Sequence, residues 1–201
     1  MTTPSLLVLA AFGLFCQVAP AKDQEQQIGA IRALYGKIGK AKETKAETLK
    51  FELKDDPMEG TITRRSFEGG LMAIKLAHTL GDHDSTEQNF YYKDGKLFFI
   101  FVQDSSWEFA PGGTEENPKT KDTLRETRYF VQDGAVLRAL RRSVSSTGDK
   151  NLGEQISKAE NEEFKPPAGD GYLFKRAEAL LGIETEDEAV KFFTNEVLPG
   201  M

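Results

Sequence analysis

A β-hairpin at the centre of the chain is encoded by residues 90–102, which read Phe90-Tyr91-Tyr92-Lys93-Asp94-Gly95-Lys96-Leu97-Phe98-Phe99-Ile100-Phe101-Val102. The Asp94-Gly95 pair lies between two apolar runs and predicts a tight turn, because these residue types tolerate the positive φ angles that such a turn requires. Residues 97–102 are apolar on both faces. We therefore expect a central strand that is covered from both sides, with Phe99 and Phe101 buried.

A second hairpin is predicted over residues 126–144. Residues 126–131 lead into Gln132-Asp133-Gly134, and a partly apolar stretch follows. The apolar spacing within residues 136–144 also suits a helix. We favour a strand because the stretch follows an Asp-Gly turn and because the two hairpins align, with Asp94-Gly95 over Asp133-Gly134. Two copies are too few for a solenoid. Two unrelated Asp-Gly hairpins would also give this alignment.

The flanking segments predict further strands and terminal helices. Apolar residues at helical spacing predict a helix over residues 24–41, and alternation predicts strands near 49–53 and 72–78. Residues 60–68 read as a polar strand at a possible edge. Residues 154–164 and 173–181 predict helices, and Thr185-Glu186-Asp187-Glu188 is a capping box for another. The fold class is therefore α+β: an antiparallel, curved sheet built from hairpins, with an N-terminal helix and C-terminal helices packed on it.

The first 21 residues are typical of a secretory signal peptide. They carry no charge, contain an apolar run from Leu6 to Phe15, and end in Ala19-Pro20-Ala21. We expect cleavage after Ala21, which leaves residues 22–201 as a single domain in the periplasm or outside the cell. The apolar run is too short to span a bilayer. Cys16 is the only cysteine, and the bulky Phe15 before it argues against lipidation, so the mature chain would have no thiol.

Composition and missing motifs exclude several classes of function. The chain has a net charge of −6 with 29% charged residues, whereas nucleic-acid binders are usually basic. The sequence contains no P-loop, no dinucleotide fingerprint and no Gly-x-Ser-x-Gly elbow. We therefore expect no cofactor, no nucleic-acid partner and no transmembrane span in the mature chain, and we lean against an enzyme.

Arginines and tyrosines of the two hairpins are candidate ligand-binding residues. Cross-strand pairing could gather three arginines of the second hairpin on one face next to Tyr129, where an anionic lipid headgroup or glycan phosphate could bind. Alternatively, these arginines pair with Glu87, Glu108 and Glu126 across the sheet. The candidate ligand-binding residues are Arg128, Tyr129, Arg138, Arg141 and Tyr91, with Arg125 and Arg142 nearby.

The two histidines of the chain offer an alternative metal site. His78, Asp82, His83 and Asp84 lie within one short segment, and these residue types can bind a metal ion if they converge. However, Gly-Asp-His-Asp-Ser is also ordinary turn composition, and His78 continues an apolar alternation. We therefore expect a structural histidine loop. Convergence of His78 and His83 in a cleft would favour a metal-dependent or hydrolytic enzyme.

The second hairpin resembles a segment of small exported proteins of Gram-negative bacteria, most of which are uncharacterised. In those proteins a Glu-Thr-Arg-Tyr-Tyr-Phe stretch precedes an Asp-Gly turn, much as Glu126-Thr127-Arg128-Tyr129-Phe130-Val131 does here. Tyr91 to Phe99 is similar to their other hairpin. The resemblance covers roughly residues 64–145, and Val131 departs from it because those proteins tend to have an aromatic residue there. It implies a periplasmic or secreted α+β protein and implies no activity.

Three functions follow from these features. The first is a non-catalytic exported protein that binds another protein or an amphipathic or anionic ligand of the cell envelope. The second is the enzyme centred on residues 78–84. The third is an envelope factor that binds acyl chains or lipid, which requires an open apolar cavity; a filled core would argue against it.

Overall fold

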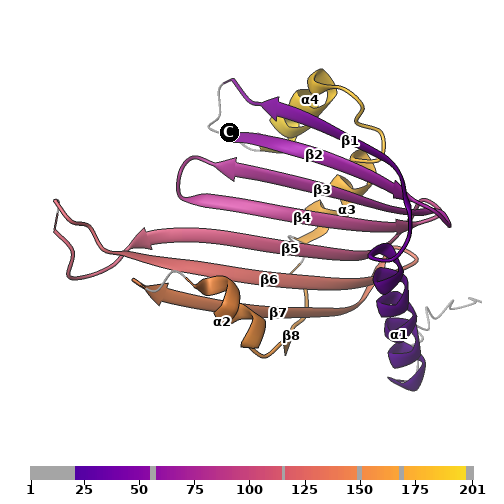
Figure 1. Cartoon of the computed structure of the whole chain (residues 1–201), viewed down its shortest axis with the longest axis horizontal. Helices are drawn as coiled ribbons and strands as arrows, with labels where there is room; N and C mark the ends of the chain where they lie inside the picture. The colour runs from indigo at the N-terminus through magenta and orange to yellow at the C-terminus, as the bar shows by residue number, and fades with distance from the viewer. Residues whose placement is uncertain (1–20, 55–57, 115, 149–150, 168–169, 198–201) are drawn as a thin grey trace, which may run out of the picture.

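The computed structural model describes residues 21–54, 58–114, 116–148, 151–167 and 170–197 (Figure 1). It contains one antiparallel sheet with helices on both faces, which confirms the predicted α+β class and its curved, hairpin-built sheet. Most of the predicted leader, including Cys16, lies outside the described residues, so export stays a prediction.

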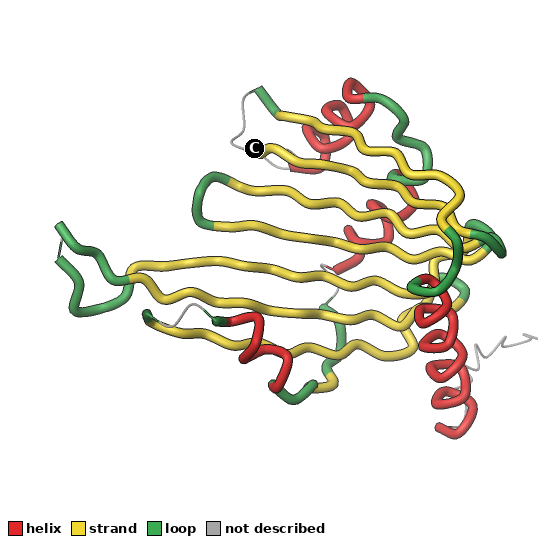
Figure 2. The backbone as a smooth tube through the Cα atoms, in the orientation of Figure 1, coloured by secondary structure: helices red, strands yellow, loops and turns green. Residues whose placement is uncertain are grey.

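The strands of the sheet lie side by side in the order in which they occur in the sequence (Figure 2). Successive antiparallel strands need only short turns between them. The sheet is open, with β1 and β8 at its edges. The prediction that residues 60–68 lie at an edge is wrong, because β1 pairs along the outer side of β2. The strands are β1 (Glu43–Glu52), β2 (Met58–Phe67), β3 (Leu71–Leu80), β4 (Asp84–Lys93), β5 (Lys96–Phe109), β6 (Thr120–Gln132), β7 (Ala135–Thr147) and β8 (Glu162–Glu163).

The β4–β5 and β6–β7 hairpins have the same construction. Their turns have φ angles of 50° and 76° at Asp94-Gly95 and of 49° and 78° at Asp133-Gly134. Each hairpin also has a register shift at the matching position, after Tyr91 in one and after Phe130 in the other. Such bulges bend a strand and increase its twist, so they help to curve the sheet. The alignment of the two sequences thus corresponds to equivalent structures, and residues 136–144 are a strand as favoured.

Helix α1 (Ala21–Ile38) covers one face of the sheet, which we call the α1 face. Ile28 and Ile31 of the helix pack in one apolar cluster with Phe99 and Phe130 of the sheet. Phe99 is buried as predicted. The prediction that Phe101 is buried is wrong: it is half-buried, and the guanidinium carbon of Arg128 lies 5.2 Å from its ring centre.

Helices α3 (Gly171–Ala179) and α4 (Glu186–Val197) cover the opposite face, which we call the α3 face. Phe193 of α4 stacks on Phe51 of β1 with a ring-centre distance of 4.6 Å. The predicted capping box is confirmed: the Thr185 hydroxyl accepts a hydrogen bond from the Glu188 amide at 3.3 Å, and the Glu188 carboxylate accepts one from the Thr185 amide at 3.0 Å.

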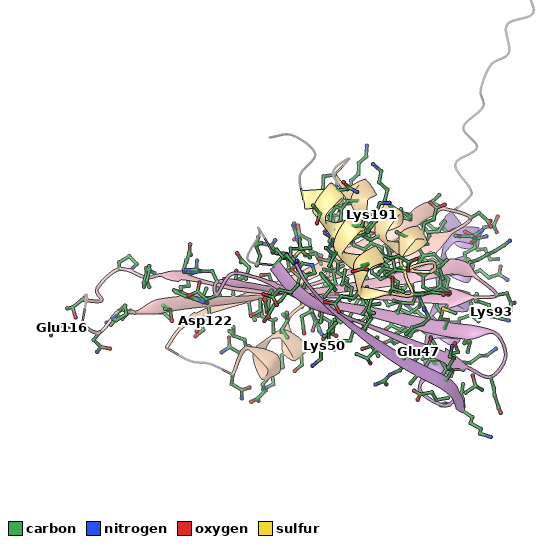
Figure 3. All side chains as sticks on the ribbon, turned by 90° about the horizontal axis from the view of Figure 1, so that it is seen from above. Glu47, Lys50, Lys93, Glu116, Asp122 and Lys191 are labelled. Atoms are coloured by element: carbon green, nitrogen blue, oxygen red, sulfur yellow. The ribbon has the colours of Figure 1, made fainter. Side chains whose placement is uncertain are left out.

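The segment between β7 and α3 departs from the expected helix over residues 154–164. Only α2 (Leu152–Lys158) is helical there, and residues 162–163 pair with β7 as the short strand β8. Figure 3 shows the sheet from its edge, with α2 on one side and α4, marked by Lys191, on the other. None of the described helices is both long and apolar enough to cross a membrane.

Candidate functional site

The two faces of the sheet separate the arginines of the second hairpin. Tyr129 belongs to the apolar cluster on the α3 face, and its neighbour Phe130 belongs to the cluster on the α1 face. Because side chains alternate along a strand, Arg125 and Arg141 lie on the α3 face with Tyr129. Three arginines do share one face, as expected, but they are on the face opposite Tyr129: Arg128, Arg138 and Arg142.

The arginines on the α1 face are occupied by structural ion pairs. The buried carboxylate of Glu126 accepts hydrogen bonds from Arg128 and from Arg142, the latter at 2.8 Å. Arg138 pairs with Glu25 of α1 and, at 3.2 Å, with Glu163 of β8. Of the three expected acidic partners, Glu126 is therefore the one that pairs with these arginines. Glu87 pairs with Lys75, and Glu108 pairs with Lys121 at 3.1 Å.

Tyr91 is a core residue rather than a surface residue. It is buried in the cluster under α1, and the ring of Tyr35 packs edge-on against it with ring centres 5.1 Å apart. Burial raises the pKa of Tyr91, and the neighbouring Tyr35 raises it further. The structure therefore gives Tyr91 no position from which to contact a ligand that approaches Tyr129.

Tyr129 and Arg141 line a polar cleft on the α3 face with a volume of about 510 Å³. The sheet forms its floor, and the segment that leads into α3 forms its wall. We call it the arginine cleft. Its lining residues are Val102, Asp104, Arg125, Thr127, Tyr129 and Arg141 from the sheet, and Phe164, Lys165, Pro167, Asp170, Tyr172 and Leu173 from the wall.

Two guanidinium groups flank the floor of the arginine cleft. In the register of β6 and β7, Thr127 lies directly opposite Arg141, and Arg125 is two residues before Thr127. Such diagonal neighbours are close enough for long side chains to reach the same point. Arg125 is exposed, and among the described residues no carboxylate lies within 4.0 Å of its charged nitrogens. Arg141 has one ion pair, at 3.3 Å with the exposed Glu162.

Two carboxyl groups oppose this positive charge. Asp170 accepts a hydrogen bond from the Tyr129 hydroxyl at 2.7 Å, which fixes the tyrosine ring in the floor. Asp104 accepts one from the Thr86 hydroxyl at 3.0 Å. Burial raises the pKa of Asp104, while the Thr86 hydrogen bond and the nearby Arg125 lower it. The carboxylate of Asp104 is therefore less favoured than that of an exposed aspartate.

Aromatic rings complete the arginine cleft. Phe164 packs edge-on against Tyr129 with ring centres 6.2 Å apart, and the guanidinium carbon of Arg141 lies 5.1 Å from the centre of the Phe164 ring. Contact with an aromatic face orients a guanidinium group while leaving its N–H groups able to bind a ligand. The cleft therefore combines positively charged donors with flat apolar surface.

A buried polar cluster adjoins the arginine cleft beneath α3. The buried Arg176 donates a hydrogen bond to Gln88 at 3.1 Å, and its guanidinium also lies 3.4 Å from Nε2 of His78. Sequence reasoning missed Gln88, Asp104, Asp170 and Arg176. A signal was present in the strands, because Gln88 and Asp104 are polar at positions that alternate with the apolar Phe90 and Val102.

The histidines do not converge. His78 lies beneath α3, where burial and the nearby Arg176 lower its pKa to about 4. His83 lies in the turn between β3 and β4, stacked on Trp107 with ring centres 3.8 Å apart. Asp82 approaches His83 at 3.4 Å, and Asp84 begins the next strand. No group of three or more metal-binding side chains occurs among the described residues.

Comparisons with protein-family models, curated proteins and solved structures found no match to this chain.

Proposed function

We propose that the protein is an exported, non-catalytic binding protein, and that its ligand carries a phosphate or carboxylate group on a flat, ring-shaped body. The observation that carries the proposal is the pair Arg125 and Arg141, which flank one open cleft on the α3 face. Arginine recognises phosphate and carboxylate through paired N–H donors. The volume of about 510 Å³ lies in the range of small-molecule sites.

The aromatic residues of the cleft support a ligand with a flat body. Phe164 and Tyr172 come from the wall, and Tyr129 is held in the floor by its hydrogen bond to Asp170. A bound ring could lie against these faces while its anionic group reaches the guanidinium groups. Asp104 and Asp170 would repel a second negative charge and could accept hydrogen bonds from hydroxyl groups. This combination favours a ligand with one anionic group and several hydroxyls on its ring.

The alternatives have less support. His78 contacts the guanidinium group of Arg176, whereas His83 stacks on Trp107. The two histidines therefore have different partners, which argues against an enzyme built on residues 78–84. An acyl-chain carrier needs an open apolar cavity, whereas apolar side chains of α3 and α4 occupy the sheet on the α3 face. A more apolar hollow of about 630 Å³ does lie beside Leu97 and Phe174. The acyl-chain hypothesis therefore stays the second choice.

Titration calorimetry with phenyl phosphate tests the proposal, with inorganic phosphate and phenol as probes of each half of the ligand. We expect phenyl phosphate to bind more tightly than either half. Arg125→Gln and Arg141→Gln should each weaken binding at least about tenfold, because each substitution removes a charge-assisted hydrogen bond to the ligand. Asp104→Asn should strengthen binding because it removes a negative charge near Arg125.

Arg65→Gln is the matched control, because Arg65 is an exposed arginine on β2 that contacts Glu43 and is remote from the cleft in the sheet order. It should leave the affinity unchanged. No heat of binding at millimolar phenyl phosphate, or equal losses in all three arginine variants, would refute the assignment of the cleft.

Export is tested separately by the mass of the protein recovered from its native envelope. We expect Lys22 as the first residue, because the signal peptide is predicted to end at Ala21. A chain that retains its leader, or one that begins with an acylated Cys16, would overturn this part of the proposal.

A further inference from the structure

A long hairpin projects from the sheet and carries the exposed Phe109 and the half-buried Trp107. Strands β5 and β6 are longer than β1 to β4, and their connecting turn extends beyond the other strands (Figure 1). In Figure 3, Glu116 marks the tip of this projection and Asp122 lies along it, away from α4, which Lys191 marks. On this hairpin Phe109 is 67% exposed. A phenylalanine that is so exposed contributes little to the core.

The aromatic side chains form a rigid group, which we call the aromatic ledge: His83, Trp107 and Phe109. The indole N–H of Trp107 donates a hydrogen bond to the Asp82 carbonyl at 2.7 Å, and its ring stacks on His83. Phe109 packs edge-on against Trp107 with ring centres 5.3 Å apart. Rings that are already fixed lose little conformational entropy when they bind a partner.

Backbone hydrogen bonds join the described residues of the turn beside Phe109. The Ala110 amide bonds to the Lys119 carbonyl at 2.8 Å, and Thr114 and Asn117 exchange two backbone hydrogen bonds at 3.1 Å and 3.2 Å. A hollow of about 370 Å³ lies between Phe109, Gly113 and Pro118. It is large enough to receive one side chain of a partner.

Acidic side chains lie next to Trp107 and His83 of the ledge. Asp122 of β6 lies directly opposite Trp107, and among the described residues it has no salt bridge. Asp82 and Asp84 flank His83 in the turn, and the Asp82 side chain is 85% exposed. Two lysines lie nearby: Lys121 is paired with Glu108 at 3.1 Å, and Lys119 lines the hollow beside Phe109, where the apolar side chain of a partner would bind. A cation on the face of Trp107 that His83 does not cover would gain both from the ring and from Asp122.

We propose that the aromatic ledge docks a basic segment of a partner protein, with an arginine or lysine side chain on the Trp107 face and an apolar side chain in the hollow beside Phe109. A basic side chain is favoured at this place for two reasons: the face of an aromatic ring attracts a cation, and the neighbouring acidic groups complement its charge. Rigid aromatic anchors of this kind carry much of the binding energy at protein interfaces. This surface is distinct from the arginine cleft, which attracts the opposite charge.

Trp107 is the only tryptophan in the chain, so its fluorescence reports on the ledge alone. The probe is a hexapeptide of alternating arginine and leucine, acetylated and amidated, with a glutamate–leucine hexapeptide as its acidic counterpart. We expect a saturable change in Trp107 emission with the basic peptide and none with the acidic one. Phe109→Ala, which keeps the reporter, should weaken binding at least about tenfold, and Asp122→Asn should weaken it severalfold.

Leu80→Ala is the matched control, since Leu80 is a 48% exposed apolar residue at the same end of the sheet. Leu80 is two residues after His78 on β3, so it lies on the α3 face with His78 and not on the face of Trp107. Urea unfolding of each variant checks that the fold is retained. No saturable change up to about 1 mM peptide would overturn the proposal. So would an equal response to the acidic peptide, or a blue shift of Trp107 with phosphatidylglycerol vesicles and not with peptide, which would indicate a membrane surface instead.

Discussion

Replacing Arg64 with methionine should weaken the attachment of the C-terminal helices to the sheet, because Arg64 caps the end of α3. Its Nη2 donates hydrogen bonds to the carbonyls of Leu180 at 2.7 Å and of Ile183 at 3.0 Å. The last carbonyls of a helix lack partners within the helix, and the helix dipole favours a positive charge there. Arg64 thus connects strand β2 to the α3–α4 connection.

The expected loss of stability is about 2 kcal/mol. Each of the two short hydrogen bonds from the guanidinium contributes about 1.5 kcal/mol, the lower end of the range for charged donors. A third contact, to the Leu181 carbonyl at 3.5 Å, is too long to add much. The buried Nε of Arg64 has no hydrogen-bond partner among the described residues, so removing it stabilises the fold by about 1 kcal/mol. This gain offsets part of the loss.

Urea denaturation followed by circular dichroism measures this loss, with Arg65→Met as the control. Arg65 is the next residue on β2, its side chain is 58% exposed, and its ion pair with Glu43 spans 3.7 Å. An exposed pair of this kind contributes less than about 0.5 kcal/mol. Hydrogen exchange should also quicken in residues 171–197 of the Arg64 variant. If the two variants unfold at the same urea concentration, Arg64 does not hold the helices and the reasoning is wrong.

Three further predictions concern the core, the turns and the pH dependence. Phe99→Ala should cost about 3–5 kcal/mol in urea unfolding, because Phe99 is buried, whereas Phe101→Ala should cost less, because Phe101 is half-buried. Gly134→Ala should lower the free energy of unfolding by about 1–2 kcal/mol, because the φ angle of 78° strains any residue with a Cβ. Gly29→Ala in α1 should raise it by up to about 1 kcal/mol, because the added Cβ meets no atom within 4 Å and alanine favours a helix. Burial and Arg176 lower the pKa of His78 from 6.5 to about 4, so as the pH falls the unfolded chain takes up this proton before the folded chain does. The free energy of unfolding should therefore fall by about 2–3 kcal/mol between about pH 6.5 and about pH 4.

Each of these three has an outcome that contradicts it. Equal losses at Phe99 and Phe101 would mean that the α1 cluster extends further than the structure indicates. A neutral Gly134→Ala substitution would show that this turn adopts another conformation in solution. For the pH dependence, His78→Gln should remove most of the loss between pH 6.5 and pH 4, and an unchanged profile would assign the effect to other groups.

The sequence by itself determined the hairpins and the type of each element near them. Asp-Gly pairs between apolar runs specify local geometry, because few other residues tolerate the positive φ angles of the turn. The same is true of the Thr185–Glu188 capping box, whose hydrogen bonds join residues three positions apart. These features depend on neighbours in the chain and can therefore be predicted without the tertiary structure.

Only the tertiary structure decided which polar residues meet. Arg128 and Arg141 lie on adjacent strands of one hairpin, but a difference of one residue in alternation sends them to opposite faces. One is then held by Glu126 beneath α2, and the other lines the arginine cleft. The partner of Arg128 is Glu126, two positions away on the same strand. The carboxylate beside Arg141 is Glu162 of β8, which the sheet brings there from 21 positions away in the sequence. The same reason separates His78 from His83: the register of the sheet and the docking of α3 bring Arg176 to His78, and no local pattern encodes that contact.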